Sequence, residues 1–505
     1  MFGQKWSRRT FIKSSSAMAA LSAVGTARVS ARAGTQETLT LTDLMLKTPR
    51  EQLLPEVARF AKQQQWTPHQ VLGALHQAVL SDLVPRSYLG GEFHSLLMVA
   101  PLLGASGFLP RAERWQPVML GLDYFAKCSG IKTDETSYKR LKDLKPRKVS
   151  ATIAKQRFEE AMLGWQTDAL PQAMVDMGNE LSEAELVSLL YRYGARDFRF
   201  IGHKVIYVDN TLLTLPLLSG PAREMAMQSL GNSLMFNGSG GYEKQRAFED
   251  IWKHNSELVS KMSENWDHGT KDATIAMLET LREAKPIASA RFAFDALNSG
   301  QSVLSIFQGC YAFAAELMYR YRSHVVALHS VTTVSSVFHG FLNSRDDVTR
   351  RQMVLQAASW MAFFRDYIRG EAPPAFDISS LEDPTEDTAI QLEGLANKTE
   401  EQRQEMAELN MGWLKQNAVM AYRQAIMSRV CKYASDIHDF KHGANVLGDV
   451  THFEPIWQRR ILSLSMVDMS LSEVVRKKKR RLEPHAFDRD EKRTASFQEA
   501  LHILA

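Results

Sequence analysis

The amino-acid sequence predicts an all-α protein, a large multi-helix orthogonal bundle or helical array with a polar, histidine-lined interior pocket. Apolar residues recur at the three- and four-residue spacing of amphipathic helices over most of the 505 residues. Hydrophobic residues make up 45% of the chain and charged residues 23%, which is typical of a globular protein with a substantial core. Several apolar segments also carry a row of polar side chains with a histidine, and buried polar groups must be hydrogen-bonded or bind something.

The first 33 residues have the form of an export signal. Residues 7–13 read SRRTFIK, the twin-arginine form, and are followed by a small, weakly apolar segment at 17–27 and an A-x-A cleavage site at 31–33. The apolar segment is too short to span a bilayer. We therefore expect the twin-arginine translocase as a partner and a periplasmic or otherwise exported location. This route carries folded proteins, often with a cofactor already installed.

Removal of this signal changes the charge of the chain. Residues 1–33 contain six Lys or Arg residues and no acidic residue, so the formal charge falls from +4 to −2. A mature chain with this charge does not call for nucleic acid as a partner. No later segment is apolar for long enough to be a transmembrane helix, so no integral membrane segment is expected in the mature chain.

The rest of the chain is expected to form a main helical domain, a connection and a C-terminal set of helices. The main domain covers 34–370. The connection, 371–402, is acidic and punctuated by proline, which favours a surface loop, a lid or an insertion. Helices resume over 403–505 and are expected to pack on the same domain, with an uninterrupted basic tail at 476–481.

The periodicity predicts the individual helices in order. Thr67 followed by Pro68 is a cap with proline at the first helical position, and it opens a helix toward residue 83. His69 and His76, seven residues apart, are expected on the exposed face of this helix. Residues 91–103 form a hydrophobic run in which His94 is the polar side chain of note. Further helices are expected over 111–128, two within 292–342, 346–369, 403–435 and 457–470.

The segment 194–216 carries the polar row around which we expect a binding site. If it is helical, Tyr207, Asn210 and Thr214 fall within about 40° of His203 at ~100° per residue. His203 is then a candidate catalytic residue, and Tyr207 and Asn210 are candidates for substrate binding. Residues 204–208 could equally form a short strand, and a buried histidine could equally be a satisfied core residue.

A second polar row lies in the apolar segment 324–342. Thr333 and Ser336 fall at about +40° and −20° from His329, which makes Thr333 a further candidate for substrate binding. His324 and His339 lie on other sides of this helix. One straight helix therefore cannot direct all three imidazoles at a single ion.

His438 and His442 are candidates for a metal site. Their i, i+4 spacing places both imidazoles on one side of a helix, where they could share a transition metal. Gly443 indicates that the helix ends nearby, so His442 is expected at the surface. His438 is flanked by Asp436 and Asp439, and a carboxylate can orient an imidazole, so the metal prediction rests on His438.

The sequence lacks several familiar catalytic motifs. It has no G-x-S-x-G elbow, no G-x-G-x-x-G fingerprint, no C-x-x-C-H haem attachment and no EF-hand loop. Its three cysteines lie far apart; one pair could form a disulfide in an oxidising compartment, although small buried hydrophobes are the simpler interpretation. Four histidines in apolar or interrupted segments remain as candidates: His94, His203, His329 and His438.

Four blocks around these histidines resemble exported bacterial proteins of unassigned activity and, more distantly, the questin oxidase-like family. The blocks are GGEFHSLLMV at 90–99, RYGARDFRFIGHKVIYVDN at 192–210, ALHSVTTVSSVFHGF at 327–341 and SDIHDFKH at 435–442. The resemblance implies an all-helical fold and a Baeyer–Villiger-type oxygen insertion into a quinone-like ring with NADPH as reductant. The twin-arginine signal and the acidic connection depart from that family, and NADPH is an unusual reductant outside the cytoplasm.

Two functional hypotheses of different class follow. In the first, an exported oxidoreductase uses a histidine-lined pocket, with His203, His329 and His94 as catalytic residues, to oxidise an aromatic or quinone-like small molecule. Its cofactor is unknown, and a transition metal or NADPH is implied by the resemblance alone. In the second, a non-catalytic binding or structural protein has these histidines as satisfied core residues, and metal storage or transport is a further alternative. The enzyme hypothesis requires His94, His203 and His329 to line one site.

Overall fold

The computed structural model describes residues 36–82, 91–130, 141, 143–235, 246–321, 325–368, 375–382, 399–433, 437–465, 487 and 490–505. Over these residues every regular element is helical, and the β pairing is limited to an isolated bridge between Lys271 and Gln301. The all-α class is therefore confirmed. The export signal, the basic run 476–481 and most of the connection 371–402 lie outside the described residues.

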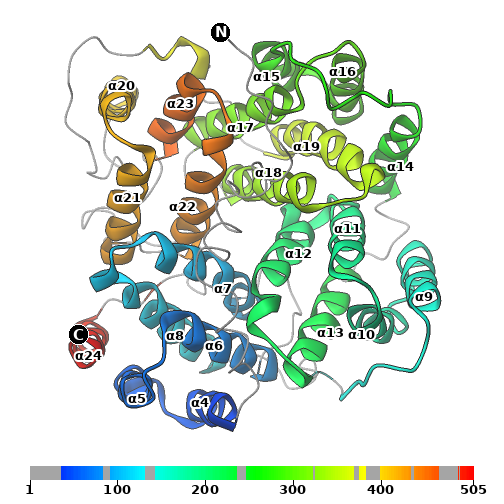
Figure 1. Cartoon of the computed structure of the whole chain (residues 1–505). Coiled ribbons are helices and arrows are strands. Elements are labelled where there is room, and N and C mark those ends of the chain that lie inside the picture. Colours follow the sequence, from blue (N-terminus) through cyan, green and yellow to red (C-terminus); the bar gives the residue numbers. More distant parts are fainter. Residues whose placement is uncertain are drawn as a thin grey trace.

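Twenty-one α-helices are described, and Figure 1 shows them packed in several layers. The N-terminal helices are α4 (Gln36–Lys47), α5 (Arg50–Gln63), α6 (Pro68–Asp82), α7 (Gly91–Phe108) and α8 (Trp115–Gly130). The next are α9 (Ala151–Leu163), α10 (Leu170–Glu180), α11 (Glu183–Gly194), α12 (His203–Thr214), α13 (Pro221–Met235), α14 (Arg246–Val259), α15 (Thr274–Glu283) and α16 (Pro286–Asn298). The last are α17 (Val303–Arg320), α18 (Val325–Asn343), α19 (Asp347–Tyr367), α20 (Glu400–Gln416), α21 (Val419–Tyr433), α22 (Ile437–Asp449), α23 (Pro455–Ser465) and α24 (Glu491–Leu504).

Capping residues begin several of these helices. α6 starts after Thr67 as predicted, and the backbone N–H of Thr67 donates to the Gln70 side chain at 2.8 Å. α11 starts with a capping box, in which the side chains of Ser182 and Glu185 each accept from the other residue's backbone. Such caps satisfy N–H groups that the first turn of a helix leaves without partners.

Two predictions about the helices are wrong. The helix expected over 403–435 is two helices, α20 and α21, because the chain becomes extended at Asn417 (φ −114°, ψ 148°). His76 is not on an exposed face: it is 1% exposed, because α4 and α7 both pack against α6. Burial lowers the pKa of His76 to about 4, so this histidine stays neutral near pH 7.

Four helices at the centre of the molecule form a closed ring. α7 packs against α12, α12 against α18, α18 against α22, and α22 against α7. α17 and α19 also pack against α18, which lies in the middle of Figure 1 and is buried along most of its length. We call α7, α12, α18 and α22 the central ring.

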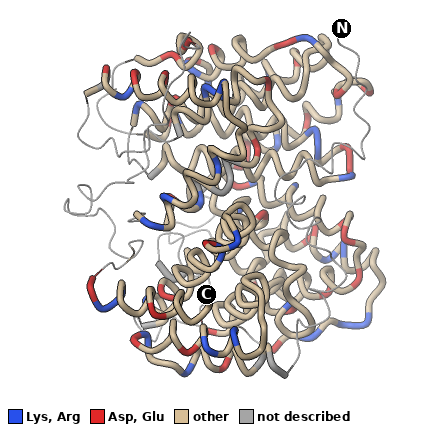
Figure 2. Tube along the Cα trace, turned by 60° about the vertical axis from the view of Figure 1, so that its left-hand side comes forward, with Lys and Arg blue, Asp and Glu red and all other residues tan. Residues whose placement is uncertain are grey.

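Charged residues of both signs are spread over the described helices. Figure 2 shows acidic and basic residues interspersed along the trace in that view. None of the described helices combines the length and apolar character needed to cross a membrane. α24, near the C-terminus, packs against α5 and α8, so the last described helix lies against helices from the N-terminal part of the chain.

Candidate functional site

Each helix of the central ring contributes one histidine, and the four imidazoles meet. His94 comes from α7, His203 from α12, His329 from α18 and His438 from α22, and these residues are between 1% and 8% exposed. Ring centroids are 5.3 Å apart for His94 and His203, and 4.5 Å apart for His203 and His329. They are 5.4 Å apart for His329 and His438, and 5.1 Å apart for His438 and His94. We call this cluster the four-histidine centre.

His203 is held in place by an unusual turn. The helix predicted over 194–216 begins only at His203, and residues 204–208 are helical, not a strand. Before it, three consecutive residues adopt left-handed backbone angles: Phe200 (φ 59°), Ile201 (φ 48°) and Gly202 (φ 85°). Such angles cost free energy for residues with a side chain and persist where the surroundings enforce them. An ion pair between Lys204 and Asp197, both buried, closes the turn.

Gly202 is required at this turn for a second reason. A Cβ atom at position 202 would collide with the Thr333 hydroxyl and would lie 3.0 Å from the Thr333 Cβ. Because position 202 is glycine, α12 approaches α18 more closely than a residue with a side chain at this position would allow. This close approach brings His203 beside His329.

Gly202→Ala is expected to destabilise the protein by more than about 2 kcal/mol, because left-handed strain and the collision with Thr333 add. Gly300→Ala is a matched control, since Gly300 has φ 84° and a Cβ added there would meet no atom within 4 Å. The control should cost only about 1 kcal/mol from backbone strain. Chemical unfolding of both variants measures this difference; equal losses would show that Thr333 does not crowd Gly202.

Hydrogen bonding fixes the ring state of His203. Its Nδ1 lies 2.8 Å from the Phe200 carbonyl oxygen, which can only accept, so Nδ1 carries the hydrogen. Its Nε2 points to the centre and lies 3.1 Å from Nε2 of His329. Two imidazole nitrogens at this separation could also bind one ion at about 2.1 Å each, with an N–metal–N angle of about 95°.

Three of the histidines have the spacing of a group that could hold a metal ion. His94, His329 and His438 each offer a ring nitrogen, and these three atoms lie within 4.8 Å of one another. Small ring rotations would bring them to the ~3.3 Å spacing of nitrogen ligands in a tetrahedral site. Imidazole donors suit zinc, copper, iron and nickel. The structure thus places His438, predicted as a metal ligand, with the three histidines predicted as catalytic.

The predicted substrate-binding residues lie in the same helices as the histidines, but the hydrogen bonds described for them are made to groups outside the four-histidine centre. The Tyr207 hydroxyl lies 2.7 Å from the Ser229 hydroxyl on α13. The Asn210 side chain donates to the Ile206 carbonyl one turn earlier, at 2.9 Å. Thr333 lies at the contact with Gly202. A role for Tyr207, Asn210 and Thr333 in substrate binding stays a prediction.

The remaining sequence candidates fall outside this centre. The side chain of His442 is outside the described residues. The three cysteines are buried thiols, in agreement with their interpretation as small hydrophobic residues: Cys128, Cys310 and Cys431.

A second buried cluster, which the sequence reasoning missed, lies further along the same helices. His339 of α18 bridges two carboxylates: Nδ1 is 3.0 Å from Asp209 on α12, and Nε2 is 2.8 Å from Asp449 at the end of α22. Tyr191 donates to Asp209 at 2.6 Å, and Tyr311 donates to Asp449 at 2.5 Å. We call these five residues the Asp–His–Asp network. The available signal was an aspartate inside an apolar helix, as in VIYVDNTLL.

Charge pairing determines the protonation of this network. Burial alone would lower the pKa of His339, but attraction and hydrogen bonds from Asp209 and Asp449 outweigh it and raise the pKa well above 6.5. Burial would raise the pKa of Asp449, but the charge and hydrogen bond of His339 lower it below its usual range. Burial and the nearby carboxylates raise the pKa values of both tyrosines, which therefore stay protonated. The network holds an imidazolium between two carboxylates.

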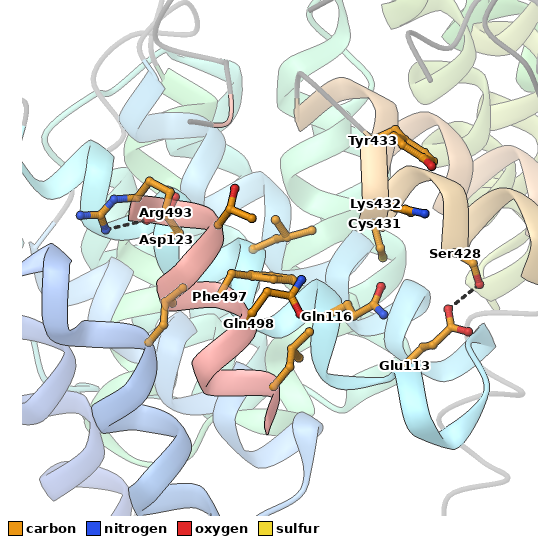
Figure 3. A pocket seen from close by; sticks show the side chains of 14 residues that line it. Glu113, Gln116, Asp123, Ser428, Cys431, Lys432, Tyr433, Arg493, Phe497 and Gln498 are labelled. Carbon is orange, nitrogen blue, oxygen red and sulfur yellow. Dashed lines mark hydrogen bonds and ion pairs between the residues drawn. The ribbon is translucent and has the colours of Figure 1, made fainter. Parts of the chain in front are cut away.

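A cavity of about 730 Å³ lies apart from these residues, between α8, α21 and α24 (Figure 3). Its lining mixes apolar side chains with the amides of Gln116 and Gln498. Asp123, also in the lining, accepts from Arg493 at 3.4 Å. The four histidines are not among the lining residues, so this cavity and the four-histidine centre are separate sites.

The four-histidine centre combines a donor set of nitrogen atoms with deep burial. Neutral imidazoles bring no negative charge, so a bound ion would keep its full positive charge in surroundings of low polarity. Without an ion, adjacent imidazoles can pass protons to one another. Comparisons of the chain with protein-family models, curated proteins and solved structures find no match.

Proposed function

We propose that the protein is an exported, metal-dependent oxidoreductase with one transition-metal ion held by His94, His329 and His438. The observation that supports this most strongly is the meeting of four imidazoles from four helices that are distant in the sequence. Burying four polar rings at one point is unfavourable in free energy compared with filling the same space with apolar side chains. The free energy of metal binding would offset this unfavourable term.

His203 has a different role in this proposal from the other three histidines. Its Nδ1 is tied to the Phe200 carbonyl, which directs Nε2 toward the centre. Three protein ligands leave a coordination position for water, oxygen or substrate, as in catalytic zinc sites. His203 would accept a proton from a molecule at that position, because its Nε2 lies beside the donor set.

The reaction class comes from the resemblance described above. We propose oxygen-dependent oxidation of an aromatic or quinone-like small molecule. NADPH would be the reductant only in a compartment that contains NADPH. Export by the twin-arginine route fits a centre whose histidines are at most 8% exposed. Such a site is most easily loaded during folding, before the folded chain crosses the membrane.

Metal binding without catalysis is the second candidate, and one observation favours it. The cavity of about 730 Å³ has the volume of a small-molecule site but is lined by none of the four histidines. A storage or structural metal site would not need an adjoining organic-sized cavity. Azide or cyanide added to the metal-loaded protein separates the two, since a change of spectrum requires an open coordination position.

Metal analysis tests the shared premise of both candidates. Protein purified after export and without a histidine tag is expected to contain about one copper, iron, nickel or zinc ion per chain. With copper, iron or nickel, the absorption spectrum should also show a visible band. Protein that is folded, metal-free and unable to take up any of these ions would contradict the metal centre and favour the histidines as core residues.

A further inference from the structure

An oblique row of polar side chains on α18 connects the four-histidine centre to the Asp–His–Asp network. His329, Thr333, Ser336 and His339 follow one another at spacings of four, three and three residues, so each is a neighbour of the next on the helix surface. The row runs obliquely along α18, with His339 about 80° round from His329 at ~100° per residue. All four are between 0% and 7% exposed. The two histidines are about 15 Å apart along the helix axis, at 1.5 Å per residue. A polar row therefore joins the two sites through an otherwise apolar core.

Both ends of this row also reach α12. Ser336 donates to Asp209 at 3.3 Å. The Thr333 hydroxyl lies against Gly202, the residue before His203, and has no hydrogen-bond partner among the described residues. α12 and α18 thus share residues of both sites, and polar contacts link the helices at each.

Two further titratable groups, Arg423 and His452, interact electrostatically with the Asp–His–Asp network. Arg423 on α21 is 2% exposed, with its guanidinium 3.9 Å from the Phe108 ring centroid. Burial lowers the pKa of Arg423 to about 10, although attraction to Asp449 opposes this, and the residue stays charged at pH 7. His452, in the 3₁₀ turn Val450–His452, is half-buried, and burial lowers its pKa. Among the described residues, the titratable groups that contact His339 or interact with its carboxylate partners include Asp209, Asp449, Tyr191, Tyr311, Arg423 and His452.

The charges of this set are balanced. Two carboxylates are matched by the imidazolium of His339 and the guanidinium of Arg423, while the two tyrosines stay neutral. A cation at the four-histidine centre would add buried positive charge with no anionic ligand to offset it. Loss of one proton from the network would supply the missing negative charge.

We propose that His339 is the proton reservoir of the four-histidine centre and releases its proton when a cation binds there. In this step the N–H bond facing Asp449 breaks, and the proton passes by way of Asp449 to solvent. The set around His339 then changes from neutral to −1, and no electrons move. When positive charge at the centre decreases, His339 takes the proton back. This inference rests on the proposed metal centre.

Calorimetric titration with Zn²⁺ alone tests the inference. Titrations in buffers of different ionisation enthalpy give the number of protons released per ion, scanned from about pH 6 to pH 9 around the ordinary pKa of histidine. Wild-type protein is expected to release about one proton more than His339→Gln in part of this range. His76→Gln is the matched control, because His76 is a buried, neutral histidine of α6 outside the central ring. Its proton count should equal that of the wild type.

A milder variant keeps the test decisive if His339→Gln does not fold. Ser335 donates to Asp449 at 2.6 Å, and Ser335→Ala removes that bond without changing any charge. A carboxylate with fewer donors holds the imidazolium more strongly, so proton release should move to higher pH. A purely structural network would leave this midpoint unchanged.

The outcomes separate the reservoir from the metal centre. Saturable Zn²⁺ binding with equal proton release in wild type and His339→Gln, or with an unmoved midpoint in Ser335→Ala, would overturn the reservoir alone. Absence of saturable Zn²⁺ binding would overturn the metal centre, and the reservoir with it.

Discussion

Replacing His329 by alanine is expected to lower the affinity of the protein for its metal ion by roughly 100-fold or more, since a lost ligand costs about 3 kcal/mol. His329 offers one of the three clustered nitrogens, and its ring adjoins both His203 and His438. Purified His329→Ala should therefore contain well under one ion per chain. Metal analysis and competition with a chelator measure the two quantities.

His76→Ala is the control for this experiment. It also removes a buried histidine, but from α6, where burial keeps the ring neutral and the side chain is not one of the three clustered ligands. It should lose stability through its cavity while retaining the wild-type metal content. If His329→Ala keeps one ion per chain, the metal is bound somewhere other than the four-histidine centre.

Replacing His339 by leucine is expected to destabilise the protein by about 3–5 kcal/mol, because two buried carboxylates lose their shared cation. The effect should depend on pH. The folded pKa of His339 is above 6.5, so its contribution is fully present below pH 6.5 and is lost as pH rises through the folded pKa. The folded pKa of Asp449 is below 3.8, so its contribution is present above pH 3.8 and is lost as pH falls through the folded pKa.

Denaturant unfolding of wild type and His339→Leu between pH 5 and pH 10 measures this dependence. This pH range includes the ordinary histidine pKa of about 6.5. The difference in unfolding free energy should be largest near pH 5 to 6 and shrink as pH increases. His76→Leu, which removes a neutral buried histidine, should show a nearly constant difference above pH 6.5. A pH-independent difference for His339→Leu would mean that its ring is neutral in the folded protein.

Local sequence determined the helical class, several helix starts and the identity of the central histidines. Helix formation and burial follow from the spacing of apolar residues and from caps such as Thr67, and both are properties of a short segment. A histidine within an apolar helix can also be recognised from the local sequence, because burying its polar ring is unfavourable whichever helix packs against it. His94, His203, His329 and His438 could therefore be named before any contact was known.

Tertiary structure alone decided which of these side chains meet. Helical spacing defines the face of a helix on which a residue lies, but the partner of that face depends on how distant helices pack. The closed ring of α7, α12, α18 and α22 gathers four histidines, and the left-handed turn before His203 allows α12 to approach α18 at Gly202. The same packing pairs Asp209 and Asp449 with His339 and buries His76. Each of these contacts joins residues far apart in the chain, and short-range periodicity contains no information about them.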